Sequence, residues 1–313
     1  CTSLTAINVS ENNPAYTSAN GILFNKSLTA LIQCPGSFSG SYTIPDSVTS
    51  IGDSAFYDCT KLTSVNIPDS VKSVGDWAFG WCASLASVTI GNSVTDIGGY
   101  AFCYCSSLAS VVIGNNVIAI GDRAFYNCDS LTSVTIPNSV TTIGRGAFDG
   151  CASLTSVTIP DSVTTIGRGA FDGCASLTSV TIPDSVTTIG WGAFGGCASL
   201  TSVTIPGNVT DIGDYAFDGC TALTAIDVSK DNANYVSDNG VLFDKPCSTL
   251  IRCPGGFSGH CTIPASVNSI SDYAFSDCAS LTSVTIPDSV TTIGRGAFGG
   301  CASLTSVTIP DSV

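Results

Sequence analysis

Cysteine recurs with a period of 23 residues along most of this chain of 313 residues. The periodic positions are Cys59, Cys82, Cys105, Cys128, Cys151, Cys174, Cys197 and Cys220, and again Cys278 and Cys301. Between two cysteines the sequence repeats the pattern L-x-x-V-x-I-P-x-x-V-x-x-I-x-x-x-A-F-x-x-C. The few apolar positions of one unit cannot enclose a core alone, whereas stacked units share one continuous core. The repeat therefore predicts a solenoid in which each 23-residue unit forms one coil.

Each coil is expected to contain a strand, a return segment and a turn. Residues 154–159, which match L-x-x-V-x-I, have the alternation and the β-branched side chains of a short strand. Equivalent strands return to the same edge and so pair in parallel, and Pro160 ends its strand because proline has no N–H for the ladder. Val163 and Ile166 then point inward from a short extended stretch. A helical or 3₁₀ turn is expected to carry Phe171 into the core.

Two longer units, of 58 residues each, interrupt the period at 2–59 and 221–278. Both contain a G-x-L-F segment and a T-x-L-I-x-C-P segment joined by a short polar stretch. Two strands separated by a short turn predict a β-hairpin, inserted between coils. The units are offset by 219 residues, from Cys1 to Cys220, which indicates a super-repeat. Because the chain starts and stops inside a repeat, we expect it to be a piece of a longer array.

Counting strands from residues 6–9 to residues 306–309 gives about thirteen stacked coils in one continuous domain over 1–313. The S-L-T-S-V-T-I-P strand and the S-V-T-T-I-G-R-G-A-F return closely resemble the BspA-type, or Treponema pallidum type, leucine-rich repeats. The resemblance covers essentially the whole chain. It implies a leucine-rich repeat solenoid with a parallel sheet on one face and short extended or 3₁₀ segments on the other. It also implies inserted hairpins, surface display and binding to host proteins or neighbouring cells.

Composition argues against several classes of function. The chain has ten Lys and Arg residues and a net charge of −14, which disfavours nucleic acid as a partner. No run of 18 apolar residues predicts a membrane span. The one histidine, His260, is expected to be a solvated turn residue, and carboxylates such as Asp161 and Asp184 recur in like surroundings. Such a ladder lacks the unlike environments that acid–base catalysis needs, so we predict no enzyme activity, cofactor or metal.

The cysteines are expected to serve packing. Those of the 23-residue period point into the core as small hydrophobic side chains, although disulfides between neighbouring coils are an alternative. Cys34 and Cys253 are equivalent in the two long units and are expected to pack in the hairpin. Cys247 and Cys261 occur only in the second long unit and are a candidate disulfide. With Cys253 and His260 they could also hold zinc, but the spacing matches no standard motif.

Two columns of exposed residues are candidate contact surfaces. On the strand face we expect a flat field of hydroxyls: Ser87, Thr89, Ser110, Ser133, Thr135, Ser156, Thr158, Ser179, Thr181, Ser202 and Thr204. This face is the usual ligand surface in leucine-rich repeats, although β-propensity alone also explains the residues. The return side carries a variable column: Asp122, Arg145, Arg168, Trp191 and Asp214. Variation in a copied unit marks either a contact surface or relaxed tolerance.

Three functions fit these features, all non-enzymatic and extracellular or at the cell surface. The first is adhesion or recognition of a surface protein or glycan through many weak contacts. The second is a structural filament, assembled by head-to-tail stacking of solenoids. The third is binding of ice or a crystalline polysaccharide by the hydroxyl columns. N-glycosylation sequons lie at Asn8, Asn25 and Asn208 and are relevant only for a secreting eukaryotic source.

Overall fold

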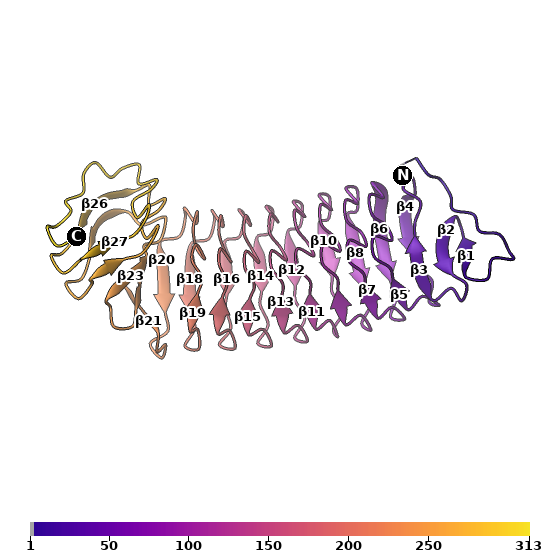
Figure 1. The fold of residues 1–313 in the computed structure, drawn as a ribbon, viewed down its shortest axis with the longest axis horizontal. Helices are drawn as coiled ribbons and strands as arrows, with labels where there is room; N and C mark the ends of the chain where they lie inside the picture. The colour runs from indigo at the N-terminus through magenta and orange to yellow at the C-terminus, as the bar shows by residue number, and fades with distance from the viewer. Residues whose placement is uncertain (1–2) are drawn as a thin grey trace.

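The computed structural model describes residues 3–313 and is an elongated stack of coils (Figure 1). Strands and turns make up the described residues, among which there is no helix. Each coil has a strand on one face, a return strand on the opposite face and a turn that leads to the next coil. The predicted leucine-rich repeat solenoid, with its parallel strands, is confirmed.

The strand face is built from parallel strands in register. Val134 pairs with Val157, one coil further on, so the 23-residue period is the pairing step. The strands are β4 (Ser39–Thr43), β6 (Lys61–Ile67), β8 (Ser87–Ile90), β10 (Ser110–Val112), β12 (Ser133–Thr135), β14 (Ser156–Thr158), β16 (Ser179–Thr181), β18 (Ser202–Ile205), β20 (Ala225–Val228), β24 (Gly259–Thr262) and β26 (Leu281–Thr285).

The structure has fewer coils than the thirteen expected from the sequence, when the strands of the strand face are counted. Eleven strands form the strand face within residues 3–313, because segments 6–9 and 306–309 are not strands. In the structure each of these end segments has a neighbouring coil on one side only. The backbone N–H of Ile7 instead donates to the carbonyl oxygen of Gly21 at 2.8 Å.

The return strands are short, with two residues in each regular coil. They are β5 (Ser50–Ile51), β7 (Ser73–Val74), β9 (Asp96–Ile97), β11 (Ala119–Ile120), β13 (Thr142–Ile143), β15 (Thr165–Ile166), β17 (Thr188–Ile189), β19 (Asp211–Ile212), β25 (Ser269–Ile270) and β27 (Thr292–Ile293). Neighbouring return strands pair in parallel, as Ile143 with Ile166. The ladder stops at β19 and starts again in the second long unit.

The predicted β-hairpin is present in each long unit, and one further antiparallel strand precedes it. The first has β1 (Tyr16–Ala19), β2 (Ile22–Asn25) and β3 (Ala30–Gln33). The second has β21 (Tyr235–Asp238), β22 (Val241–Asp244) and β23 (Thr249–Arg252). The last strand of each joins the return ladder, since Leu31 pairs with Ile51 and Leu250 with Ile270.

The turns form a third ladder along the solenoid, which we call the turn edge. In the coil at 167–174, the N–H groups of Gly169, Phe171 and Gly173 each donate to a carbonyl oxygen of the next coil at 2.8 Å. Gly169 and Gly173 have φ of 60° and 68°. Left-handed residues at these two positions break any right-handed helical path. The expected helical or 3₁₀ turn is therefore wrong.

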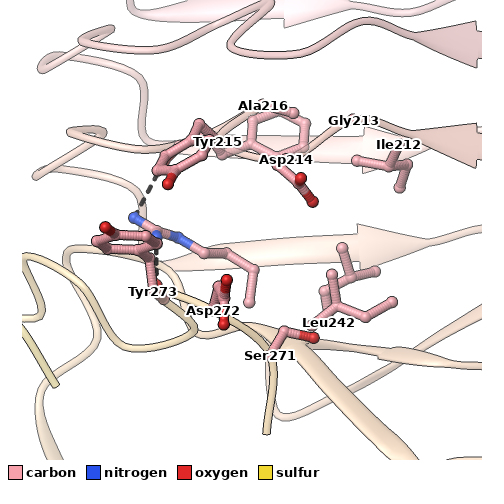
Figure 2. Close-up of a pocket in the computed structure, with 12 residues that line it drawn as sticks. Ile212, Gly213, Asp214, Tyr215, Ala216, Leu242, Ser271, Asp272 and Tyr273 are labelled. Atoms are coloured by element: carbon pink, nitrogen blue, oxygen red, sulfur yellow. Dashed lines mark hydrogen bonds between the residues drawn. The ribbon is translucent and has the colours of Figure 1, made fainter. Parts of the chain in front are cut away.

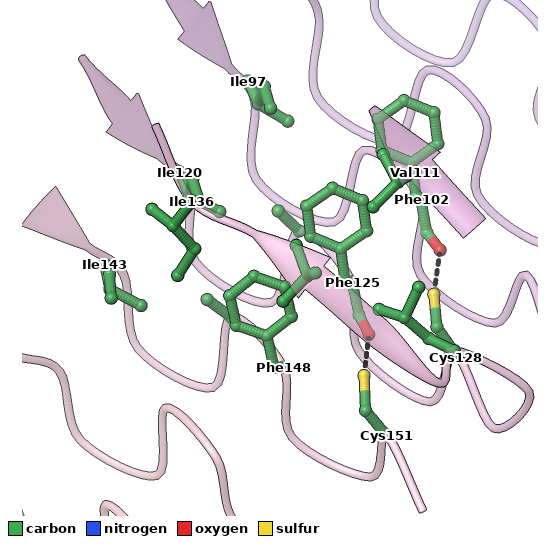
Figure 3. Packing of buried hydrophobic residues seen from close by; sticks show 14 of the residues in the cluster. Ile97, Phe102, Val111, Ile120, Phe125, Cys128, Ile136, Ile143, Phe148 and Cys151 are labelled. Atoms are coloured by element: carbon green, nitrogen blue, oxygen red, sulfur yellow. Dashed lines mark hydrogen bonds between the residues drawn. The ribbon is translucent and has the colours of Figure 1, made fainter. Parts of the chain in front are cut away.

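Stacked phenylalanines and buried cysteines fill the core beside the turn edge (Figure 3). The rings of Phe102 and Phe125 lie 5.3 Å apart and nearly parallel, and the stack continues to Phe217. The thiol of Cys128 donates to the carbonyl oxygen of Phe102 at 3.2 Å, as the equivalent thiols do in neighbouring coils. Burial raises the pKa of the Cys128 thiol well above its usual value, which keeps the thiol protonated as a donor.

The phenylalanine stack is interrupted at the long units. In the second long unit Cys253 takes the place of the phenylalanine. Its backbone N–H donates to the carbonyl oxygen of Ala274, just as that of Phe171 donates to the carbonyl oxygen of Ala193. The buried residues accordingly form two clusters that divide near Leu242. The organisation of 1–313 as one domain stays a prediction.

Candidate functional site

The strand face is a flat surface of hydroxyl groups. All eleven residues predicted for it are exposed and alternate with side chains that point into the solenoid. Val112, which is 59% exposed, interrupts the threonine column as the sequence indicates. Flat hydroxyl surfaces lack the aromatic and arginine anchors that dominate protein interfaces. The role of this face in binding stays a prediction.

The sequence predicted His260 in a turn, but in the structure it lies on the strand face. It is exposed in β24, and its Nδ1 lies 2.7 Å from the hydroxyl oxygen of Ser283 in the next coil. The same alternation that exposes His260 buries its neighbour Cys261. The two side chains therefore point to opposite faces. No group of three or more metal-ligating residues suits a metal ion within residues 3–313.

The five residues of the predicted variable column lie on successive coils of the turn edge and are all exposed: Asp122, Arg145, Arg168, Trp191 and Asp214. Asp122 has a structural role, because its Oδ1 accepts the backbone N–H of Arg145 at 2.8 Å. The same contact joins Asp272 to the N–H of Arg295 at 2.7 Å. Asp214 instead lines a cavity beside the second long unit. The column is therefore one surface only from Arg145 to Trp191.

Bulky side chains occupy left-handed positions of the turn edge. Trp77 and Tyr100 have φ of 59° and 56°, and Trp81 and Tyr104 have φ of 63° and 57°. Two to three units later the same positions are glycines with the same conformation, for example Gly146 with φ of 60°. A left-handed conformation costs a non-glycine residue about 1 kcal/mol. The aromatic residues are thus placed against their local backbone preference.

Stacking offsets this cost. The rings of Trp77 and Tyr100 are parallel with centroids 4.2 Å apart, and those of Trp81 and Tyr104 lie 4.1 Å apart. Arg123 continues the first stack, since its guanidinium donates to the hydroxyl of Tyr100 at 2.5 Å. An aromatic pair contributes about 0.5–1.5 kcal/mol beyond its buried area, which is comparable with the strain.

The aromatic stack ends at a groove lined by arginines. Three arginines of successive coils reach this cavity of about 180 Å³: Arg123, Arg145 and Arg168. Gly146, Gly169, Asp149, Asp172 and Trp191 complete the lining. The guanidinium carbon of Arg168 lies over the Trp191 ring, 4.3 Å from its centroid. We call this site the arginine groove; it unites three residues of the predicted column.

Two half-buried carboxyl groups set the charge of the arginine groove. Burial raises the pKa of Asp149 to about 6, the carboxylate of Asp172 adds to the shift, and Arg123 opposes it. Burial likewise raises the pKa of Asp172. Below about pH 6 the groove therefore becomes more positive, because Asp149 takes up a proton while the arginines stay charged.

The sequence did not single out Arg123, Asp149 or Asp172. The column that reads Trp77, Tyr100, Arg123 and Gly146 in successive units varies as much as the predicted column next to it. That variation was a usable signal. Its meaning depends on the left-handed turn, which the sequence did not predict.

A smaller cavity, of about 100 Å³, lies where the second long unit interrupts the turn edge (Figure 2). Tyr215 and Tyr273 flank it, and their ring centroids lie 5.0 Å apart. Asp214 and Asp272 line its exposed side.

Arg252 is nearly buried beneath this cavity and ties together the coils on both sides of it. Its Nη1 donates to the carbonyl oxygen of Tyr273 at 2.7 Å and its Nη2 to that of Ser276 at 3.2 Å. An ion pair of 3.0 Å joins it to Asp218 in the preceding coil. Gln33 stands in the equivalent place in the first long unit. These contacts indicate that Arg252 braces the junction.

The cysteines of residues 3–313 are all free thiols in the structure. Cys261 replaces Tyr42 of the first long unit and lies near Cys253, whose pKa it raises. Cys247 lies in the turn between β22 and β23 and is partly exposed. The Cys247–Cys261 disulfide stays a prediction, which peptide mapping without reduction tests, with Cys253–Cys261 as the competing pair.

The sequons lie in different settings. Asn8 and Asn208 are exposed. The Asn25 amide donates to the hydroxyl of Thr29 at 2.9 Å, and its oxygen accepts the N–H of Thr29 at 2.8 Å. A glycan on Asn25 would have to use the amide hydrogen that Thr29 does not accept, and the Asn208 amide likewise already donates, to the carbonyl oxygen of Asp184 at 2.7 Å. Their use in a eukaryotic source stays a prediction. Among the described residues, no helix is long and apolar enough to cross a membrane.

Comparison with known proteins places this fold in a family. The BspA type leucine-rich repeat region matches residues 34–155, 141–243 and 258–313. No curated protein matches the chain significantly.

Several solved structures are similar to the chain. A leucine-rich cell surface protein of Faecalibacterium prausnitzii has 36% identity and a TM-score of 0.74, over 96% of this chain and 78% of that one. The leucine-rich repeat protein of Treponema pallidum has 30% identity and a TM-score of 0.51, over 62% of this chain and 82% of that one. A leucine-rich repeat protein of Bacteroides ovatus, with 24% identity and a TM-score of 0.50 over 98% of this chain and 96% of its own, shows the same fold. The chain is a member of the BspA-type leucine-rich repeat family, whose members are repeat proteins and not known as enzymes.

Proposed function

We propose that this protein mediates adhesion or recognition at the cell surface or outside the cell, through weak contacts repeated along the solenoid. The observation that carries the proposal is the arginine groove. Arginine and tryptophan are the residues that most often anchor interfaces. Here Arg145, Arg168 and Trp191 converge on one cavity, whereas the strand face carries mainly serine and threonine.

The similarity to a cell surface protein supports the location. The solenoid supports the mode of binding, because Arg145 and Arg168 take equivalent positions in successive coils and several weak contacts together strengthen binding. The partner is a surface protein or a glycan.

The test is binding of the purified chain to arrays of extracellular proteins and glycans, immobilised at high and at low density. Binding at high density that fades at low density is the expected result. A variant with Arg145→Gln, Arg168→Gln and Trp191→Ala should lose it, whereas Lys61→Gln with Lys72→Gln, a matched change of charge elsewhere, should retain it. Binding that the groove variant leaves unchanged contradicts the role of the groove. Absence of binding to every array contradicts the function.

The alternative predicted from the sequence is a filament built by head-to-tail stacking of solenoids. Parallel ladders on the strand face, the return face and the turn edge all run along the stacking direction, which favours this geometry. Negative-stain electron microscopy across a dilution series tests it. Filaments that persist on dilution support the alternative, and isolated short rods contradict it.

A further inference from the structure

A cavity of about 220 Å³ lies beside β24 in the second long unit. Within residues 3–313, β24 pairs with β26 along one edge and with no strand along the other, so the ladder of the strand face is interrupted here. The cavity is lined by eight residues: Asp238, Asn239, Val241, Phe243, Phe257, His260, Cys261 and Thr262. The four polar ones are exposed and most of the others are buried, so an apolar wall lies behind a polar rim.

The first long unit shows which group fills the corresponding place. An offset of 219 residues relates the two units, so that Cys261 corresponds to Tyr42 and Phe257 to Phe38. The ring of Tyr42 is half-buried and packs edge-on against Phe38, with centroids 5.4 Å apart. Cys261 has no ring, so Phe257 lacks this partner. The cavity thus lies beside a place from which an aromatic ring is missing.

The side chains of the wall are smaller than in the first long unit. Val241 replaces Ile22 and Cys261 replaces Tyr42, whereas Phe243 is a phenylalanine in both units. An apolar cavity of about 150 Å³ is large enough to hold benzene. Aromatic rings in contact stabilise each other beyond the area that they bury. The wall therefore suits a single aromatic ring.

The rim has gained groups that can form hydrogen bonds. Asp238 replaces Ala19, and His260 replaces Ser41. The side-chain amide of Asn239 donates to Oδ1 of Asp238 at 3.2 Å, which holds this carboxylate at the mouth of the cavity. A ligand hydroxyl that donates to a carboxylate forms a charge-assisted hydrogen bond, about twice as strong as a neutral one. The rim therefore favours a ring that carries a hydroxyl group.

We propose that this cavity binds a small phenol, which is the tyrosine side chain without its backbone. The ring packs against Phe257 as the Tyr42 ring packs against Phe38, and the phenol hydroxyl donates to Asp238. The cavity is separate from the arginine groove, and the proposal does not rest on the proposed function.

Ligand-observed fluorine NMR with para-fluorophenol tests the proposal, because the method detects weak binding of small molecules. With the thiols kept reduced, the fluorine relaxation should become faster when the chain is added. Cys261→Tyr should abolish this effect, since it restores the ring of the first long unit. It should fold, as judged by circular dichroism, because Tyr42 is accommodated there. Cys247→Tyr, the same change outside the cavity, should retain the effect.

Two further measurements test the rim and the ring. Asp238→Ala, which restores the residue of the first long unit, should weaken binding about tenfold. Para-cresol should displace the probe, and cyclohexanol, which has the hydroxyl but no aromatic ring, should do so about threefold more weakly. The proposal is overturned if the probe does not respond, if Cys261→Tyr or Asp238→Ala binds it like the unmodified chain, or if the two competitors are equal.

Discussion

Two regions of the turn edge have the same backbone and opposite surfaces. In residues 75–105, the aromatic coils, the left-handed positions hold Trp77, Tyr100, Trp81 and Tyr104. In residues 144–196, the glycine coils, the same positions hold only glycine. The φ angles agree closely, with 59° at Trp77 and 60° at Gly169. The backbone is therefore set by the ladder between coils and by the core, and not by the residue at the turn.

The difference between the two regions lies in whether a left-handed position holds glycine, the residue that its backbone conformation favours. Glycine adopts a left-handed conformation at almost no cost, so the glycine coils need no compensation. In the aromatic coils the left-handed conformation costs free energy, and ring stacking offsets that cost. One region is thus a closed, self-stacked ridge, and the other is an open groove bordered by arginines.

The core should not distinguish the two regions. Phe102→Ala in an aromatic coil and Phe171→Ala in a glycine coil should each lower the free energy of unfolding by about 3–5 kcal/mol, because each removes a buried ring from the stack. The ring of Phe102 lies 5.1 Å from Phe79, and that of Phe171 lies 5.4 Å from Phe148. Denaturant titration followed by circular dichroism measures both. A loss confined to one region would show that the turn edge contributes to local stability more than the core.

The left-handed positions should separate strain from stacking. Trp77→Ala removes the stack and keeps the strain, whereas Trp77→Gly removes both, so the alanine variant should be less stable by about 1 kcal/mol. Gly192→Ala should lose a similar amount, since the added Cβ meets no atom within 4 Å and the cost is purely conformational. Unfolding midpoints give these values. Equal stability of the Ala and Gly variants at Trp77 would show that the left-handed conformation of this residue carries no strain.

The carboxyl groups of the groove should make only the glycine coils sensitive to pH. The folded-state pKa of Asp149 is raised to about 6 by burial and Asp172, against the pull of Arg123, so the folded chain holds a proton that the unfolded chain has lost. Stability should therefore decline as pH rises from about 4 to about 6 and level off above. Because the group is half-exposed, the total should be about 1 kcal/mol or less. Asp149→Asn should flatten this part of the profile, and an unchanged profile would contradict the assignment.

Much of this architecture follows from the sequence because a repeated apolar pattern permits one solution. Residues such as Val157 and Phe171 must point inward in every coil for stacked coils to share a core, and they do. The additional strand that precedes the hairpin in each long unit was not predicted. Its sequence, Y-T-S-A in β1, lacks the apolar alternation that marks the two hairpin strands. That strand is held by its pairing with β2.

The groove could be predicted only in part. Arg145, Arg168 and Trp191 stand out by their variation along the sequence, but their convergence with Asp149 and Arg123 depends on the left-handed turns. Bulky residues disfavour that conformation, so the sequence Trp77-Ala78-Phe79 favours a right-handed turn. The tertiary ladder overrides this local preference.

The smallest expected effect tests whether the groove is ordered before any ligand binds. Arg168 lies over Trp191 at 4.3 Å, and an exposed cation–π pair contributes about 0.5–1 kcal/mol, so Arg168→Gln should lower the free energy of unfolding by about that amount. Arg145→Gln should change it hardly at all, because the Arg145 guanidinium pairs with no carboxylate among residues 3–313. In a Trp77→Phe, Trp81→Phe background Trp191 is the single tryptophan, so its fluorescence reports on the surroundings of this ring, which include Arg168 and Tyr215. A shift with Arg168→Gln but not with Arg145→Gln would mean that Arg168 is held in place against the ring. Identical spectra would mean that the glycine coils lack the side-chain order of the aromatic coils, and that any ligand must itself arrange the arginines.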